Sequence, residues 1–538
     1  MSTSNINIHS IELVLLVLLG AIALIAGLAR RLSISYPIVL VITGLTLGLL
    51  PGIPHLHLSP DVVFLIFLPP LLSSAAWQTS WRDFRYNLVS IALLAIGLVF
   101  FTAVGVAYLA HFFLPSFDWR AGFLLGAVVS TTDAVAATSI AKQIGMPRRI
   151  EDVLEGESLV NDATGLLALE FGVGMIVRGT TPSLGAGALH LIWLLGGGIL
   201  IGLLVGMIVS WFETLIDDGP VEIALSLIVA YGVYLAGEAA RASGVIAVVT
   251  CGLYMSRKSA TYFSPTVRLQ VMSVWGALEF LLNGLVFILI GLQLPYVLSE
   301  IKGYSHMQLL MYGAIFSAVL ITLRLLWMYP GALIAYKIRR HILHQETTMP
   351  NGRMIFVLGW TGMRGVVALA AASSLPYSLN NGAPFAQRSL IIFLTFSVIL
   401  VTLVLQGLTL PSLVKKLGLA QSDGPECEEG EARRILIDRA IEHLKDSRRH
   451  ESEDLQHAYD DVLHLYEDRL QSLAACDFGS TVQKKNTSPV HHVMLEAVQS
   501  EREELIQLRN LDRIDDELYR TLERELDLSE SQLIQSHR

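Results

Sequence analysis

Long apolar segments separated by short polar connections run through most of the chain. A helix needs about 20 mostly apolar residues to cross a membrane. Thirteen segments of the 538-residue chain approach that length, and we predict a membrane helix for each. They cover residues 11–29, 36–51, 60–77, 88–114, 120–143, 152–177, 186–212, 220–239, 243–256, 269–295, 307–335, 354–376 and 389–413. The ninth is short enough to be tilted, re-entrant or fused with the eighth. The pattern predicts an all-α polytopic membrane protein.

Beyond Leu417 the pattern becomes amphipathic. Turn-forming residues 421–425 predict a linker. Apolar residues then recur at spacings of three and four, which is typical of helices with one buried face. They are Leu455, Ala458, Val462 and Leu465, and then, after a break at 477–489, Leu511, Ile514, Leu518, Leu522 and Leu526. We expect a membrane domain over 1–417 and a helical cytoplasmic domain over 418–538, which either packs or dimerises, or else regulates the membrane domain.

Charge divides the chain in the same way. Residues 1–417 hold 23 Lys and Arg against 19 Asp and Glu, whereas residues 418–538 hold 15 against 28. The three cysteines are too few and too scattered for a disulfide framework or a metal cluster. The chain has no phosphate-binding Gly-x-x-x-x-Gly-Lys-Ser/Thr sequence, so ATP is not the obvious energy source. We expect no enzymatic activity, no cofactor and no nucleic-acid partner.

Basic residues in the connections predict the orientation, because cytoplasmic loops are enriched in Lys and Arg. Alternate connections hold 16 basic residues on one side and five on the other. The amino terminus is therefore predicted outside and the carboxyl terminus in the cytoplasm, with the protein in the cell (inner) membrane.

Glu157-Ser158-Leu159-Val160-Asn161-Asp162 places two carboxylates inside an apolar segment. Ionisable groups at membrane depth are costly, and they usually line a pathway or pair with another group. On a helix, Ser158 and Asp162 share one face and Glu157 and Asn161 share a neighbouring one, with Glu157 about 140° from Asp162. This divergence suggests one acid for a mobile ion and one for a fixed partner.

Two further segments are interrupted by polar residues or glycine. Ser130-Thr131-Thr132-Asp133 lies in the fifth predicted span, and Gly359-Trp360-Thr361-Gly362-Met363-Arg364-Gly365 lies in the twelfth. Hydroxyl and carboxyl groups can bond freed backbone groups, and three glycines in seven residues disfavour a continuous helix. Two broken helices in opposite halves of the chain are typical of inverted-repeat transporters.

Four other charged residues lie at membrane depth. Arg324 and Arg364 fall inside apolar segments, where an unpaired guanidinium costs roughly 2.5–3.5 kcal/mol even on insertion scales. We expect each to have a carboxylate partner from another helix. Glu238 and Glu279 are expected to have structural roles.

Several motifs together resemble the monovalent cation:proton antiporter-1 family, which includes the bacterial NhaP-type and animal NHE-type sodium/proton exchangers. The resemblance covers about residues 10–417. The similar motifs are Leu68-Pro69-Pro70-Leu71-Leu72, Thr132-Asp133, Glu157-Ser158-x-x-Asn161-Asp162, Leu282-Asn283-Gly284-Leu285-Val286-Phe287, Gly362-Met363-Arg364-Gly365 and Gln406-Gly407.

The resemblance implies a homodimer of thirteen-span protomers, each with dimerisation helices and a mobile core of spans 4–6 and 11–13. It implies that Asp162 binds the cation and the proton. Thr132, Ser158, Asn161 and Asp133 would complete this site, in part through backbone carbonyls. Glu157 would pair with Arg324, and Asp133 would lie near Arg364 where the broken helices cross.

One departure from the family pattern concerns the third predicted span. Members of the NhaP type often carry an acid shortly after Leu-Pro-Pro, whereas Ser73-Ser74-Ala75-Ala76 follows here. The missing carboxylate puts in doubt any ligand from that helix, and with it the ion preference.

These observations predict a secondary antiporter in which Asp162 holds either a proton or a small monovalent cation. Oxygen ligands suit Na⁺ or Li⁺, and a K⁺/H⁺ antiporter is the alternative. The Asn161-Asp162 pair leaves one mobile carboxylate, so by resemblance exchange is electroneutral. A gated cation channel would need a ring of acids or carbonyls, and a non-transporting sensor would not exchange ions at all.

Overall fold

Helices account for almost all of the regular structure in the computed structural model of the chain. The structure describes residues 8–32, 35–49, 63–114, 117–177, 179, 184–301, 303–345, 348–379, 382–419 and 424–449, with shorter pieces between 456 and 530. Its contacts divide the chain into two units, Met1–Ser422 and Asp423–Arg538. The first contains every apolar segment predicted above.

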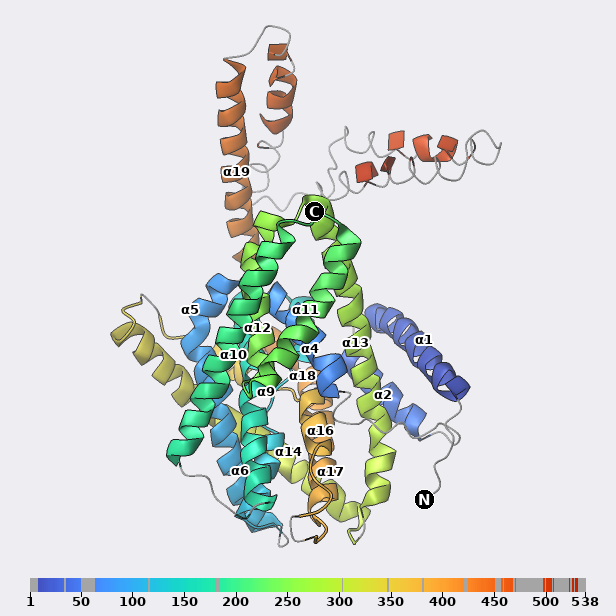
Figure 1. Ribbon diagram of the computed structural model, residues 1–538, viewed down its shortest axis with the longest axis vertical. Helices are drawn as coiled ribbons and strands as arrows, with labels where there is room; N and C mark the ends of the chain where they lie inside the picture. Colours follow the sequence, from blue (N-terminus) through green and yellow to red (C-terminus); the bar gives the residue numbers. More distant parts are fainter. Residues whose placement is uncertain are drawn as a thin grey trace. The chain divides into compact units, whose positions relative to one another are not determined.

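Each of the thirteen predicted segments overlaps a helix (Figure 1). The first half contains α1 (Ile8–Leu32), α2 (Tyr36–Gly48), the π-helical turn η1 (Val63–Phe67), α4 (Leu68–Gln78), α5 (Trp81–Ala92), the π-helical turn η2 (Leu93–Leu98), α6 (Val99–Phe113), α7 (Trp119–Val128), α8 (Ala134–Ile144), α9 (Arg148–Val177) and α10 (Leu184–Glu213). The second half contains α11 (Gly219–Ala239), α12 (Gly244–Tyr262), α13 (Pro265–Glu300), α14 (His306–His341), α15 (Gly352–Trp360), α16 (Val366–Ser373), α17 (Arg388–Val401), the π-helical turn η3 (Thr402–Gln406) and α18 (Gly407–Leu417).

Seven helical stretches among the described residues are long and apolar enough to cross a membrane. They are Trp81–Phe113, Arg149–Val177, Gly185–Glu213, Gly219–Ala239, Thr266–Ser299, His306–Ile342 and Arg388–Leu417. The number is below thirteen in part because two predicted spans are broken into half-helices. The protein is a multi-pass membrane protein, and the number of crossings stays a prediction.

The ninth predicted segment forms a helix of its own. The helix α12 is 19 residues long and is separated from α11 by residues 240–243. Ser243 caps its start by accepting a hydrogen bond from the amide of Ile246 at 3.2 Å. Arg257 and Lys258 lie in its last turns, so the helix extends past the apolar segment that predicted it.

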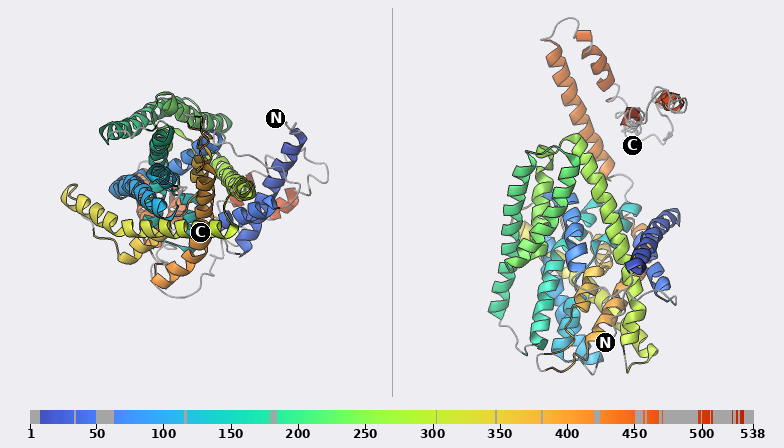
Figure 2. Two further views of the ribbon diagram at one scale, coloured as in Figure 1. Left: turned by 90° about the horizontal axis from the view of Figure 1, so that it is seen from below. Right: turned by 45° about the vertical axis from the view of Figure 1, so that its right-hand side comes forward.

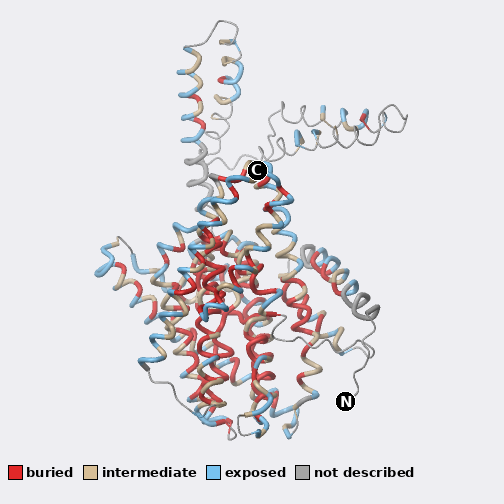
Figure 3. The backbone as a smooth tube through the Cα atoms, viewed as in Figure 1, coloured by how far each residue is buried: buried red, intermediate tan, exposed pale blue. Residues whose placement is uncertain are grey.

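Helix packing separates an interior from a periphery. In Figure 1, α16 lies between α9 and α13, and it contacts both of them and α17. The helix α1 packs on α2 and α13 at the edge of the bundle (Figure 2). Buried positions are concentrated in the middle of the bundle (Figure 3). In the most apolar part of Arg388–Leu417 72% of residues are buried, against 22% for Gly185–Glu213, so α10 presents most of its apolar surface outward.

The second unit contains a helical hairpin, formed by α19 and the described residues between 456 and 470. Its first helix, α19 (Gly424–Arg448), begins inside the predicted linker, since proline is tolerated in the first turn of a helix. Ile437 and Ile441 of α19 form a small core with Leu463. Arg448 pairs with Asp460 at 2.8 Å. The predicted break at 477–489 and the apolar positions from Leu511 to Leu518 lie outside the described residues.

Candidate ion-binding site

The fifth predicted span is broken between α7 and α8, as its polar cluster predicted. The helix α7 ends at Val128, residues 131–133 are non-helical, and α8 begins at Ala134. The Ser130 hydroxyl donates to the carbonyl of Ala127 at 2.7 Å, and Asp133 caps α8 by accepting from the amide of Val135 at 2.8 Å. Side chains therefore replace backbone hydrogen bonds at the break, which is why these residue types favour it.

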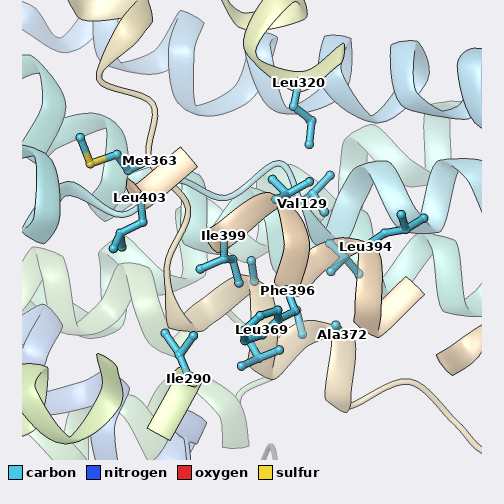
Figure 4. Close-up of a cluster of buried hydrophobic side chains, with 14 of the residues drawn as sticks. Val129, Ile290, Leu320, Met363, Leu369, Ala372, Leu394, Phe396, Ile399 and Leu403 are labelled. Carbon is cyan, nitrogen blue, oxygen red and sulfur yellow. The ribbon is translucent and has the colours of Figure 1, made fainter. Parts of the chain in front are cut away.

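The twelfth predicted span is broken between α15 and α16, and the two breaks are in direct contact. The amide of Asp133 donates to the carbonyl of Met363 at 2.9 Å. A Cβ atom at Gly365 would overlap the carboxylate of Asp133, so only glycine permits this approach. Val129 and Met363, one beside each break, belong to the same hydrophobic cluster (Figure 4). The broken helices therefore cross in the interior.

The helix α9 presents its two acids to different surroundings. Ser158 and Asp162 line a cavity of about 260 Å³, together with Thr132 and Asp133 of the first break. Glu157 is instead turned toward α14, and Asn161 toward the hydroxyl of Thr132. Helical periodicity predicted this division, because residues four apart share a face.

Asp162 is the buried carboxylate on this cavity for which the described residues provide no partner. It is 5% exposed, and its Oδ1 atom has no hydrogen-bond partner. None of the hydrogen bonds and ion pairs found among the described residues includes its side chain. A buried carboxylate that faces a cavity and lacks a partner can take up a proton or a cation.

Glu157 is held by Arg324 in a bidentate ion pair, as the resemblance implied. The Arg324 Nη1 atom lies 2.5 Å from Glu157 Oε1, and Nη2 lies 2.8 Å from Oε2. Both side chains are only 1% exposed. The Thr132 hydroxyl also donates to Glu157 at 3.0 Å. The negative charge of Glu157 is therefore compensated within the protein.

Besides Asp133, three of the predicted ligands have hydrogen bonds within the protein. The Thr132 hydroxyl accepts from the Asn161 amide at 2.5 Å, besides donating to Glu157. The Ser158 hydroxyl donates to the carbonyl of Thr132 at 3.0 Å and accepts from the amide of Ala134 at 3.3 Å. These side chains hold the first break in place beside Asp162. Any ion contact from them must use remaining oxygen lone pairs.

Arg364 requires a correction. Among the described residues no carboxylate lies within ion-pair distance of it, and backbone carbonyls take the place of the expected partner. Its Nε atom donates to the carbonyl of Val129 at 3.1 Å, and Nη1 donates to the carbonyl of Gly362. Val129 follows α7, and Gly362 lies just beyond the end of α15. The carboxyl ends of helices carry partial negative charge, so the guanidinium compensates two half-helix ends at once.

Two further cavity residues were not selected from the sequence as ligands. Thr131 has a buried hydroxyl with no hydrogen-bond partner, and it precedes the predicted ligand Thr132. Glu279 of α13 lines the same cavity, and its Oε2 atom accepts from Ser74 Oγ and from Gln78 Nε2, each at 2.8 Å. The segment after Leu-Pro-Pro thus lacks its own acid but binds one from α13. The sequence signal that could have identified Glu279 as a cavity residue is the presence of a carboxylate within an apolar segment.

Comparisons with known proteins agree on one family. The family model for the transmembrane sodium/hydrogen exchanger matches residues 18–416. The chain is 34% identical to an uncharacterised Na⁺/H⁺ exchanger of Mycobacterium tuberculosis, over 97% of this chain and 96% of that protein. It is 32% identical to a sodium, potassium, lithium and rubidium/H⁺ antiporter of Bacillus pumilus, over 96% of this chain and 77% of that one.

A solved structure supports the fold. The sodium proton antiporter of Methanocaldococcus jannaschii, solved at pH 8, matches with a TM-score of 0.60 and 20% sequence identity, over 76% of this chain and 98% of that one. At this identity the match concerns the arrangement of helices. Together with the matching family model and relatives over almost the full length, it identifies the chain as a member of the sodium/hydrogen exchanger family.

Proposed function

We propose that the protein exchanges a monovalent cation for protons, and that Asp162 binds both in turn. The observation that carries this proposal is the unpartnered oxygen of Asp162 on the shared cavity. Its acidic neighbours are engaged: Glu157 by Arg324, Asp133 by the amide of Val135, and Glu279 by Ser74 and Gln78. Asp162 is the acid whose charge a mobile ion must compensate.

Competition at this carboxylate couples the two fluxes. An ionised, unpartnered carboxylate is costly at membrane depth, whereas a proton or a bound cation neutralises it. The mobile core of spans 4–6 and 11–13 therefore changes between its inward-facing and outward-facing states only when one of the two ions is bound. Thr131 and Thr132 line the same cavity and can add oxygen ligands from the first break, and oxygen donors suit the alkali cations.

The cavity reaches the side that the basic connections assign to the cytoplasm. Gln78, Lys142 and Glu155 line it near the connections that follow α4 and precede α9. Lys142 and Glu155 pair at 3.7 Å. We therefore assign this structure to an inward-facing state in which cytoplasmic ions reach Asp162.

Na⁺ is the proposed cation, with Li⁺ and K⁺ as alternatives. One relative is named for exchange of sodium, potassium, lithium and rubidium, so a K⁺/H⁺ antiporter is the second candidate. The neighbouring Asn161 carries no charge, and we propose electroneutral exchange of one cation for one proton. A homodimer, an outside amino terminus and a regulatory or packing role for residues 418–538 complete the proposal; light scattering of the purified protein tests the dimer.

Exchange by the purified protein in liposomes should be independent of the membrane potential. A pH-sensitive dye inside the liposomes should report proton movement when Na⁺, Li⁺ or K⁺ is added outside. One uncompensated charge gains about 2.3 kcal/mol per 100 mV, so an electrogenic cycle would change strongly with an imposed potential. A rate that follows the potential contradicts electroneutrality, and cation flux without coupled proton movement indicates a channel.

Glu279→Gln should raise the cation concentration needed for half-maximal exchange on the order of fivefold, with little change in the maximal rate. The reason is the loss of one screened attraction of about 1 kcal/mol at the cavity. Ser74→Ala should shift the same constant less, because the carboxylate remains but loses one of its two donors. Asp217→Asn, at an exposed acid of the α10–α11 connection, is the control. An unchanged constant in Glu279→Gln removes Glu279 from the cation path.

A further inference from the structure

Two arginines at the ends of two helices approach one tyrosine of a third, apart from the cavity of Asp162. The guanidinium of Arg339, in the last turn of α14, lies 3.9 Å from the centre of the Tyr86 ring of α5. The guanidinium of Arg149, in the first turn of α9, lies 5.7 Å from the centre of the same ring. Two like charges are therefore held close together by contacts with an uncharged ring.

The positive charge of Arg339 is buried and incompletely bonded. The residue is 4% exposed, its Nε atom donates to Gln345 Oε1 at 3.1 Å, and its Nη2 atom has no hydrogen-bond partner. None of the ion pairs found among the described residues includes Arg339 or Arg149. Buried charges in proteins are normally paired, so in the described part of the chain this arrangement lacks an anion.

A cavity of about 90 Å³ is lined by both arginines. Its lining residues with polar side chains are Asn87, Ser90, Tyr336 and Thr348 besides the two arginines, and the others are apolar. None of the described residues that line it carries a carboxylate. The volume is well above the roughly 10–15 Å³ that a cavity needs to hold one water molecule. The cavity therefore has room for a small anionic group.

Arginine favours phosphate, because its planar array of donors matches two phosphate oxygens at once. Two guanidinium groups also match the charge of a phosphate better than that of a single carboxylate. Basic pockets between membrane helices on the cytoplasmic side are suited to acidic lipid headgroups. We propose that the pocket formed by Arg149 and Arg339 between α5, α9 and α14 binds a phosphate group, from an acidic phospholipid or from free phosphate.

A bound phosphate stabilises the membrane unit, because it joins α9 to α14 at the end of both helices. The test uses the full-length protein in uncharged detergent without phosphate and measures its melting temperature by intrinsic fluorescence. Inorganic phosphate is added in one arm, with chloride at matched ionic strength. Mixed micelles with phosphatidylglycerol are used in the other, with phosphatidylcholine as the neutral lipid. In at least one arm, the melting temperature should rise with ligand concentration to a plateau above the value measured with chloride or phosphatidylcholine.

Arg149→Gln should weaken the apparent affinity for the stabilising ligand roughly tenfold, as expected for one charge-assisted hydrogen bond. Arg149 is exposed, so this variant should fold even if Arg339→Gln does not. Arg82→Gln, at an arginine with an 85% exposed side chain on α5, should keep the wild-type affinity. Stabilisation by phosphatidylglycerol alone identifies the source as lipid, and stabilisation by both identifies the phosphate group itself.

Glu346 is the site of a further control variant. It follows Gln345, which bonds Arg339, and it lies outside the described residues. The variant tests whether its carboxylate takes the place of the ligand. Glu346→Gln should leave the response to ligand unchanged. The proposal is overturned if neither ligand stabilises the wild type, if Arg149→Gln responds as the wild type does, or if a response occurs only in Glu346→Gln. The last result would mean that the chain fills the pocket with its own carboxylate.

Discussion

Asp162→Asn should abolish cation-driven proton movement, down to the level of protein-free liposomes. Asparagine keeps the shape of the side chain but can neither release a proton nor neutralise a cation. Asp162 is the acid on the cavity whose oxygen lacks a partner, so the remaining oxygens have no comparable charge to offer. The measurement is dye-reported proton movement after addition of Na⁺, Li⁺ and K⁺ in separate experiments.

The same variant should fold at least as well as the wild type. It removes a buried ionisable group that has no partner, and such groups oppose folding when charged. Its melting temperature should therefore equal or exceed that of the wild type. Glu170→Gln, at an acid on the same helix whose side chain is 66% exposed, should retain exchange. Exchange by Asp162→Asn above background contradicts the central role given to Asp162.

Glu157→Gln and Arg324→Gln should each destabilise the protein severely, by about 3–5 kcal/mol, because each leaves an uncompensated buried charge. Both side chains are 1% exposed and joined by two hydrogen bonds. The double variant removes both charges and should recover part of the loss. Melting temperatures of the four proteins, measured as loss of monodisperse protein on heating, form a double-mutant cycle.

The coupling free energy is the difference between the loss of stability in the double variant and the sum of the two single losses. Its size distinguishes an ion pair from two independent sites. Independent sites would give additive losses, whereas a charged pair gives a double variant more stable than the sum predicts. Arg353→Gln, at an exposed arginine that donates to the carbonyl of Leu417, should behave as the wild type does. Additive losses in the double variant would mean that the ion pair does not account for the burial of both charges.

The apolar pattern was sufficient to predict the helices of the membrane unit but not to predict where each of them ends. Each apolar segment overlaps a helix because a backbone in lipid must satisfy its own hydrogen bonds. Both breaks were also predictable, since Ser130 and Asp133 bond nearby backbone groups and glycine weakens the helix at 359–365. The end of α12 was not, because Arg257 and Lys258 end its apolar pattern before its hydrogen bonding ends.

The sequence by itself determined which residues of α9 share a face, because helical geometry depends only on spacing. The spacing alone therefore places Asp162 and Glu157 on different faces of the helix, whatever their partners are. Only the tertiary structure decided the partners: backbone carbonyls for Arg364, Ser74 and Gln78 for Glu279, and Tyr86 for Arg339. These contacts join residues on different helices, and no local pattern encodes which helix faces meet. The physical reason is that burial demands a partner for each polar group without specifying its place in the chain.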